Sequence, residues 1–281
     1  MSSDDAPAAG NQAAAEAGQA RPVPFDPGVA HQARMYDYLL GGKDNYTADR
    51  EAVEATLKAW PEMGFAARAN RAFLGRVVRF LAAEAGIRQF LDLGTGIPTA
   101  GNTHEVAQAI APQSRVVYVD YDPVVLAHAR ALLASHQAGA TAYVDADLRD
   151  SATVLAKAAE VLDFSQPVAV TLLTTLHAIP DEEDPQSILA AYMTEVTPGS
   201  YLAISHSGAE FFAQETKDAF GSIGDRISQG FNVRTRDQLA RLLGCTELVE
   251  PGLVPVEEWR PDGSAGTGGK SSLWGAVGRK R

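Results

Sequence analysis

A glycine turn at the end of an apolar segment is the part of this sequence that most clearly indicates chemistry. Residues 90–101 read FLDLGTGIPTAG, in which Asp92 supplies a carboxylate just before the turn. Gly94 and Gly96 have no Cβ atom, so the backbone there can turn sharply and approach a ligand closely. In open α/β sheets, a strand followed by such a turn marks where a nucleotide-like ligand binds.

The residues after the turn narrow the kind of ligand. The dinucleotide-binding pattern G-x-G-x-x-G has a third glycine, but here Thr99 occupies that position, after Pro98. This departure favours a ligand without a pyrophosphate, such as S-adenosylmethionine, over NAD or FAD. An NAD-dependent oxidoreductase remains the alternative interpretation of the turn.

Two further strand-like segments also end in carboxylates. RVVYVD at residues 115–120 ends in Asp120, which in a doubly wound sheet can accept both ribose hydroxyls of an adenosyl group. ATAYVD at residues 140–145 runs into an acidic loop, where a carboxylate can accept a hydrogen bond from an adenine amino group. A single aspartate at a strand end is commonly a helix cap. Three acidic strand ends in succession instead indicate a ligand-binding edge.

The strongest candidate for proton transfer is His177, which lies just beyond the expected fourth strand in TTLHAIPD, residues 174–181. An unperturbed imidazole has a pKa of about 6.5, which suits a general base. The alternative role is to shape this loop by hydrogen bonding. The sequence has no His/Cys cluster with zinc spacing and no P-loop lysine after the glycines, so we expect no metal site.

The elements that position these residues alternate between strand and helix from Arg88 onward, which predicts a mostly parallel sheet with helices on both faces. Seven strands are expected, the last two in an antiparallel hairpin, as in the Rossmann-like α/β fold of class I methyltransferases. We expect residues 26–86 to form an N-terminal helical cap or lid and residues 87–281 to form the methyltransferase domain. Arg68, Arg71, Arg76 and Arg79 are assigned to a solvated helix face, and residues 252–270 to a loop.

Composition limits the partners and the compartment. The chain has 281 residues and a formal net charge of -11, which argues against a general affinity for nucleic acid or an anionic membrane. Its one cysteine, Cys245, excludes an internal disulfide and fits a reducing cytoplasm. Residues 1–25 are expected to form a disordered tail, because they lack the apolar core of a signal peptide. No segment approaches the length of a membrane span.

The segment RMYDYLLGGKDNYTADR, residues 34–50, is similar to the N-terminal signature of an actinobacterial S-adenosylmethionine-dependent methyltransferase family whose substrates are largely unassigned. Residues 69–74, 90–99, 143–150 and 251–255 match other stretches of that family, and the resemblance extends from about Pro27 to Arg279. It implies a class I methyltransferase fold and S-adenosylmethionine as cofactor. It implies no particular acceptor.

The resemblance also implies roles for residues at the strand ends. Asp92, Gly94 and Gly96 should flank the methionine moiety and the ribose, and Asp120 should hold the ribose hydroxyls. Asp147 and Leu148, which follow the third strand, should border the adenine. Asp122, which follows the second strand, is either a neighbour of the cofactor or the cap of the next helix.

The N-terminal signature has its own physical interpretation. Gly41 and Gly42 permit a tight reversal, and polar and aromatic groups are dense around them, so this loop could fold over the cofactor and exclude water. The alternative is a plain connection between two helices whose polar residues cap the helix ends. The candidate lid or acceptor-binding residues are Arg34, Tyr36, Tyr38, Lys43, Asn45 and Tyr46.

The leading function is methylation of a small-molecule acceptor on oxygen, nitrogen or carbon. A water-excluding site can supply most of the acceleration by orienting the acceptor against the methyl group, and a base is needed only if the acceptor must lose a proton. The alternative is a non-catalytic, regulatory protein that binds S-adenosylmethionine and transfers nothing.

Overall fold

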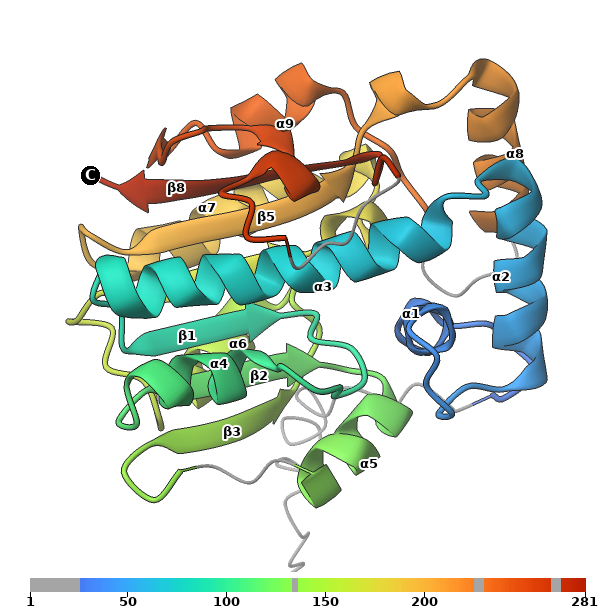
Figure 1. Cartoon of the computed structure of the whole chain (residues 1–281). Helices are drawn as coiled ribbons and strands as arrows, with labels where there is room; N and C mark the ends of the chain where they lie inside the picture. The colour runs from blue at the N-terminus through green and yellow to red at the C-terminus, as the bar shows by residue number, and fades with distance from the viewer. Residues whose placement is uncertain (1–25, 133–135, 225–229, 264–268) are drawn as a thin grey trace, which may run out of the picture.

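The computed structural model describes residues 26–132, 136–224, 230–263 and 269–281, so the expected disordered tail lies outside the described residues. One sheet dominates the molecule, with the strand order β3-β2-β1-β4-β5-β8-β6 and with β7 paired to β8 (Figure 1). Its strands are β1 (Gln89–Leu93), β2 (Arg115–Asp120), β3 (Ala140–Asp145), β4 (Ala169–Leu173), β5 (Tyr201–Ser207), β6 (Thr246–Leu248), β7 (Val254–Pro255) and β8 (Leu273–Lys280).

The first five strands are parallel, and β8 runs antiparallel between β5 and β6. Strand β1 is buried along its whole length, as expected for a central strand that is covered on both faces. The expected class I methyltransferase sheet with its antiparallel end is therefore confirmed. The expected loop over residues 252–270 is wrong in part, because it contains the short strand β7 and the fully buried Trp259.

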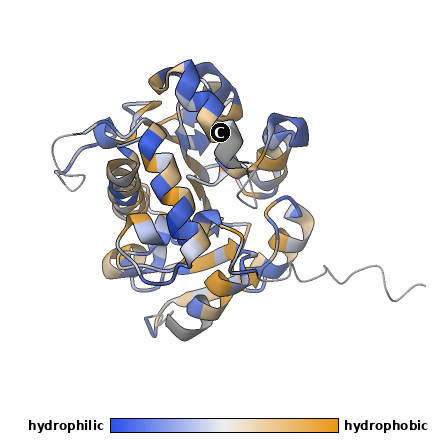
Figure 2. Cartoon of the chain, turned by 90° about the vertical axis from the view of Figure 1, so that its right-hand side faces the viewer, coloured by the Kyte–Doolittle hydropathy of each residue, from blue (hydrophilic) through white to orange (hydrophobic). Residues whose placement is uncertain are grey.

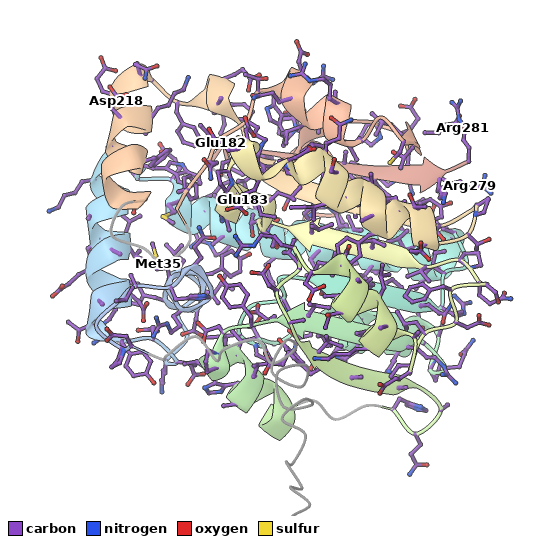
Figure 3. The ribbon with its side chains drawn as sticks, turned by 180° about the vertical axis from the view of Figure 1, so that it is seen from behind. Met35, Glu182, Glu183, Asp218, Arg279 and Arg281 are labelled. Atoms are coloured by element: carbon purple, nitrogen blue, oxygen red, sulfur yellow. The ribbon has the colours of Figure 1, made fainter. Side chains whose placement is uncertain are left out.

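Helices cover both faces of the sheet. On one face lie α3 (Met63–Arg79), which continues as a π-helical turn over Phe80–Glu84, and α4 (Thr103–Ile110). On the other face lie α6 (Ser151–Ala158), α7 (Pro185–Glu195) and α9 (Arg236–Leu242), and α5 (Pro123–Leu132) contacts β3. Figure 1 shows α3 and α4 in front of the sheet, and Figure 3 shows the face covered by α6 and α7.

Three more helices stand at the carboxyl end of the parallel strands, namely α1 (Gln32–Leu39), α2 (Thr47–Ala59) and α8 (Gln214–Gly224) (Figure 1). In the view onto this end, the foreground helices alternate hydrophilic and hydrophobic residues (Figure 2). This pattern is typical of helices with one packed face and one exposed face. None of the helices in the described ranges combines the length and the apolar character of a membrane span.

The solvated arginine face expected for α3 is wrong at two positions. Arg76 is buried and donates hydrogen bonds to the backbone oxygens of Trp259 and Val256, at 2.9 and 2.6 Å. Arg71 donates to the loop after β1, including a 2.8 Å bond to Asn102 Oδ1. Sequence periodicity could not separate these residues from exposed arginines, because their partners come from distant segments of the chain.

Candidate active site

A cavity of about 360 Å³ lies at the carboxyl ends of β1 to β4, between the sheet and α1. Asp92, Asp120 and Asp147 all line it, so the tertiary structure brings the three expected strand-end carboxylates to one place. Met35 of α1 and Glu183 of the loop after β4 also line it, and Figure 3 labels both residues. Parallel strands bring their carboxyl ends to one edge, which explains this gathering.

The glycine turn has the backbone conformation that requires glycine. Gly94 and Gly96 have φ angles of 73° and 69°, in the left-handed region. The amides of Gly94 and Thr95 donate to Val119 O, which fixes the turn against β2. A Cβ atom at Gly94 would lie 2.1 Å from Thr175 Cγ2, whereas one at Gly96 would find Ala33 Cβ nearest, at 3.8 Å. Gly94 is therefore needed for close packing, and Gly96 leaves space beside α1.

Asp92 is buried and held by two hydroxyl groups. Thr103 Oγ1, at the start of α4, donates to it at 2.7 Å, and Thr171 Oγ1 on β4 donates at 2.9 Å. Burial raises the pKa of Asp92, although both hydrogen bonds act in the opposite direction. The carboxylate thus joins three elements below the cavity as well as lining it.

Asp120 organises the backbone around the glycine turn. Its Oδ2 accepts from the Gly96 amide at 2.9 Å, and its Oδ1 accepts from the amides of Tyr121 and Asp122 at 2.8 and 3.0 Å. Burial raises the pKa of Asp120, and the backbone hydrogen bonds oppose that rise. Because a carboxylate has about four lone-pair sites, three backbone donors still leave capacity for a ligand hydroxyl.

Asp147 and Leu148 follow β3 at the side of the cavity. Asp147 forms a two-point ion pair with Arg149, whose Nη1 also lies 2.8 Å from Glu183 Oε2 in the loop after β4. Leu148 is buried, and its backbone oxygen accepts a hydrogen bond from Tyr192 OH. The Arg149 pairs therefore connect two strand-end loops across this part of the cavity.

His177 lies in a short 3-10 turn after β4 and lines the cavity. It is only 7% exposed, and its Nδ1 is buried without a hydrogen-bond partner among the described residues. Burial, with smaller contributions from His206 and Arg234, lowers the pKa of His177 to about 3. The imidazole is therefore neutral near pH 7, and its low proton affinity makes it a poor general base.

Arg234 holds the loop that carries His177. The guanidinium is buried and donates to the backbone oxygens of Leu176 and Ile179, at 2.8 and 2.6 Å. It also contacts His206 Nε2 at 2.9 Å and pairs with Asp181. Sequence analysis assigned nothing to Arg234, because no local pattern distinguishes it from other arginines.

A comparison with protein families identifies the family of this chain. A model of the S-adenosyl methyltransferase family matches residues 18–281. The chain belongs to this family. S-adenosylmethionine is therefore the cofactor of this methyltransferase, and the NAD-dependent alternative is wrong.

Solved structures give the same family relationship. The chain is similar to a DUF574 family protein from Streptomyces avermitilis MA-4680, with 45% identity, 91% of this chain and 99% of that chain covered, and a TM-score of 0.87. It is also similar to a putative methyltransferase from Thermobifida fusca YX, with 40% identity, 90% and 96% covered, and a TM-score of 0.81. No curated protein matches this chain.

The residues around the cavity fit an adenosyl group. Gly96 leaves room where a side chain would project, and Asp120 and Asp147 provide acceptors suited to hydroxyl and amino donors. The cationic side chains among the described lining residues are Arg71 and Arg149, and Arg149 is paired with two carboxylates. This charge balance suits a cofactor without phosphate groups.

Several expected site residues of the methyltransferase lie outside the cavity lining. Asp122 accepts from the amide of Val124 at the start of α5, and its Oδ2 lies 2.8 Å from His31 Nδ1. Burial acts to raise the pKa of Asp122, but the hydrogen bond and the charges of His31 and Arg34 outweigh it, and the pKa is lowered. Asp122 is thus a helix cap and ion-pair partner, and buried Arg34 lies beside it.

The loop between α1 and α2 is a helix connection rather than a cavity wall. Asn45 Nδ2 donates to Asp37 Oδ2 at 2.8 Å, and the Tyr46 amide donates to Asp49. Tyr38 OH donates to Glu54 on α2. The expected lid residues Tyr38, Asn45 and Tyr46 therefore join the two helices, with Arg34 over the Tyr46 ring, while Lys43 is exposed. Of the six candidates in this segment, Tyr36 lines the cavity.

A buried polar network next to Tyr36 was missed by sequence analysis. Asn70 Nδ2 lies 3.1 Å from Tyr36 OH and 3.2 Å from Thr174 Oγ1, and Asn70 Oδ1 accepts from Ser205 Oγ at 2.6 Å. The network joins α1, α3, β5 and the end of β4 beneath the cavity. Thr174 has a φ of 55°, an unusual conformation that this network supports. The only sequence signal was the family-like stretch at residues 69–74.

Proposed function

We propose that this methyltransferase transfers the methyl group to a small-molecule acceptor inside the cavity described above. One observation carries the proposal. The glycine turn, the strand-end carboxylates, His177 and apolar side chains from the helical cap line one cavity. A pocket that combines apolar walls with polar groups at defined positions is typical of small-ligand sites.

The residues at the sheet edge would hold the cofactor. In this proposal Asp120 binds the ribose hydroxyls, and Asp147 and Leu148 border the adenine ring. The rest of the nucleoside lies beside Gly96. Arg71 lines the cavity, and no carboxylate of the described residues forms an ion pair with it. Its guanidinium is suited to the carboxylate of the methionine moiety.

When bound, S-adenosylmethionine supplies a methyl group activated by a positively charged sulfur. The chain's contribution is orientation and exclusion of water, since the side chains around the cavity are largely buried. His177 is neutral, so it can orient an acceptor through a hydrogen bond but is a weak proton acceptor. Acid–base catalysis by this histidine is therefore not part of the proposal.

We assign the covering role to α1 and α2. The expected cap of residues 26–86 also includes α3, but α3 packs along the sheet together with α4. Tyr36 OH donates to Ala67 O at 2.9 Å, and His31 pairs with Asp122, so α1 is attached to α3 and to the β2 side of the cavity. The free thiol of Cys245 supports a cytoplasmic location, because exposed cysteines persist unpaired in reducing compartments.

The test is turnover with the full chain. The protein is incubated with S-adenosylmethionine and fractionated extracts of small molecules, and S-adenosylhomocysteine formation is measured together with the mass gain of one methylated compound. Product formation that depends on one fraction supports the proposal. Tight cofactor binding without turnover on any fraction would instead favour a non-catalytic, regulatory protein.

A further inference from the structure

The lining residues of the cavity fall into a charged set and an apolar set that come from different elements, and we call the parts of the cavity beside them the charged half and the apolar half. Its charged lining residues come from the sheet edge, the loops that follow the strands, and Arg71 of α3. We define the strap as residues 230–234, between α8 and α9. The cap helices α1 and α2, the first residue of α3 and the strap contribute mainly apolar and aromatic side chains. These are Met35, Leu39, Trp60, Met63 and Phe231.

We propose that the acceptor is an uncharged, mainly aromatic small molecule that binds in this apolar half, against Trp60 and Phe231. The inference rests on the proposed function, because it assigns the sheet-edge half of the same cavity to the cofactor. It goes further by naming the class of substrate that the remaining half can hold.

The apolar half has a built aromatic wall. The Phe231 ring lies 6.5 Å from Trp60 and 4.9 Å from His177, measured between centroids. Behind it, Phe212 and Phe220 pack edge-to-face with Trp60, at 5.1 and 6.0 Å. Aromatic rings favour such offset and edge contacts with one another, so a flat aromatic ligand can extend the cluster.

The wall is held in place by hydrogen bonds along the strap. Both the backbone amide and the side-chain amide of Asn232 donate to His177 O, each at 2.9 Å. Arg234 ties the end of the strap to the same loop through Leu176 and Ile179. Phe231 is therefore fixed relative to His177, as a specificity-determining side chain requires.

The charges around the cavity argue against an ionised acceptor. Moving an unpaired charge into such an apolar site is costly. The charged groups nearby are paired or assigned to the cofactor. Arg149 pairs with Asp147 and Glu183, and Asp92 accepts two hydroxyl hydrogen bonds. Arg71 is assigned to the carboxylate of the methionine moiety. Gln32, Tyr36 and His177 are among the polar side chains that line the cavity together with these apolar residues. They suit one hydroxyl or amino group on an otherwise apolar molecule.

The transfer itself balances without a further reactant. A lone pair on the acceptor's nitrogen or oxygen forms the new bond to the methyl carbon. The bond from that carbon to sulfur breaks, its electron pair stays on sulfur, and the acceptor's proton is released to water.

Calorimetry with three naphthalene probes tests the charge preference. The full chain is saturated with S-adenosylhomocysteine and titrated near neutral pH with 2-naphthol, 2-naphthoate and 2-naphthylmethylammonium, which share one ring system. We expect 2-naphthol to bind with a Kd at least about tenfold lower than either charged probe. Equal or tighter binding of a charged probe, or no binding of 2-naphthol, would overturn the inference.

Two matched variants locate the probe. Phe231→Leu should weaken 2-naphthol binding by roughly tenfold and leave the Kd of S-adenosylhomocysteine unchanged. Phe220→Leu removes a ring from the same cluster but not from the cavity lining, so it should change the Kd of 2-naphthol by less than about threefold. Equal effects of the two variants would contradict binding against Phe231. Failure of S-adenosylhomocysteine to bind the wild type would overturn the proposed function itself. If the wild type binds S-adenosylhomocysteine but not 2-naphthol, only this inference is overturned.

Discussion

His177 and His206 are two neutral imidazoles buried beside a buried arginine. Burial, with a smaller contribution from Arg234, lowers the pKa of His206 to about 4 and that of His177 to about 3. His206 Nδ1 lies 2.9 Å from Ser207 O, and its Nε2 lies 2.9 Å from Arg234 Nη1. A proton on Nε2 would break the contact with the guanidinium, which gives the low pKa a structural cause.

These two pKa values predict acid sensitivity. In the unfolded chain each histidine binds a proton below a pH of about 6.5, but in the folded protein it does so only below about 4 or 3. The unfolded state therefore binds more protons in this window, and stability falls as the pH drops from about 6.5. Urea unfolding of His206→Asn should show a loss between pH 7 and pH 5 that is smaller than the wild-type loss by about 2 kcal/mol. The same loss in both proteins would contradict the assignment.

A single added carbon at Gly94 should both strain the backbone and clash with a neighbouring side chain. Gly94→Ala combines a positive φ with a Cβ contact of 2.1 Å to Thr175, so we expect a loss of roughly 3 kcal/mol and no measurable binding of S-adenosylhomocysteine. Gly101→Ala is the control, since its φ is 76° but nothing lies within 4 Å of the added carbon. The control should lose only about 1 kcal/mol. Denaturant unfolding and calorimetry measure both quantities.

At the scale of elements, the strap and the loop after β4 behave as one unit. Arg234 is the central connection, because it bonds two backbone oxygens of that loop and the side chain of His206 on β5. On the other side of the cavity, α1 is anchored by the His31 pair with Asp122. The cavity is therefore framed by two segments attached to the sheet edge through buried polar contacts.

Removing the arginine from the strap should destabilise this unit. Arg234→Met leaves at least three buried acceptors without their donor, so urea unfolding should show a loss of roughly 3 kcal/mol or more. Arg241→Met, at an exposed position in the last turn of α9, should change stability by less than about 0.5 kcal/mol. A small effect of Arg234→Met would show that the loop is held by other contacts.

At the scale of the whole molecule, one sheet connects the two cores and carries the cavity at its edge. The α3 side and the α7 side each have a continuous apolar cluster, and the cavity lies where both meet the cap helices. A ligand that fills this cavity therefore contacts several parts of the fold at once, and its binding free energy adds to the stability of the folded chain.

Thermal unfolding should report this coupling. S-adenosylhomocysteine at about one hundred times its Kd should stabilise the protein by about 2.7 kcal/mol and raise the Tm accordingly. NAD at the same concentration should leave the Tm unchanged, because Thr99 stands where the pyrophosphate-binding pattern has its third glycine. A shift with NAD that equals the shift with S-adenosylhomocysteine would contradict the fit of the site.

The sequence by itself determined the features that depend on neighbouring residues. The apolar run and glycine turn at residues 90–96 placed Asp92 at a strand end, and the same reasoning placed Asp120 and Asp147 at the same edge. The helix start at Thr235 was also predictable, since Thr235 and Gln238 bond each other's backbone amides. Periodicity, turn chemistry and capping act over a few residues, so they place strands and helices along the chain but do not fix the order of the strands in the sheet.

Only the tertiary structure decided which side chains face the cavity. Tyr36 and Tyr38 lie two residues apart in one helix, yet Tyr36 lines the cavity and Tyr38 bonds Glu54 on α2. Phe231 became a wall residue because Asn232 bonds the loop of His177, more than fifty positions earlier in the chain. The direction of a side chain and the pKa of a buried imidazole depend on segments distant in sequence, and these meet only after the sheet has formed.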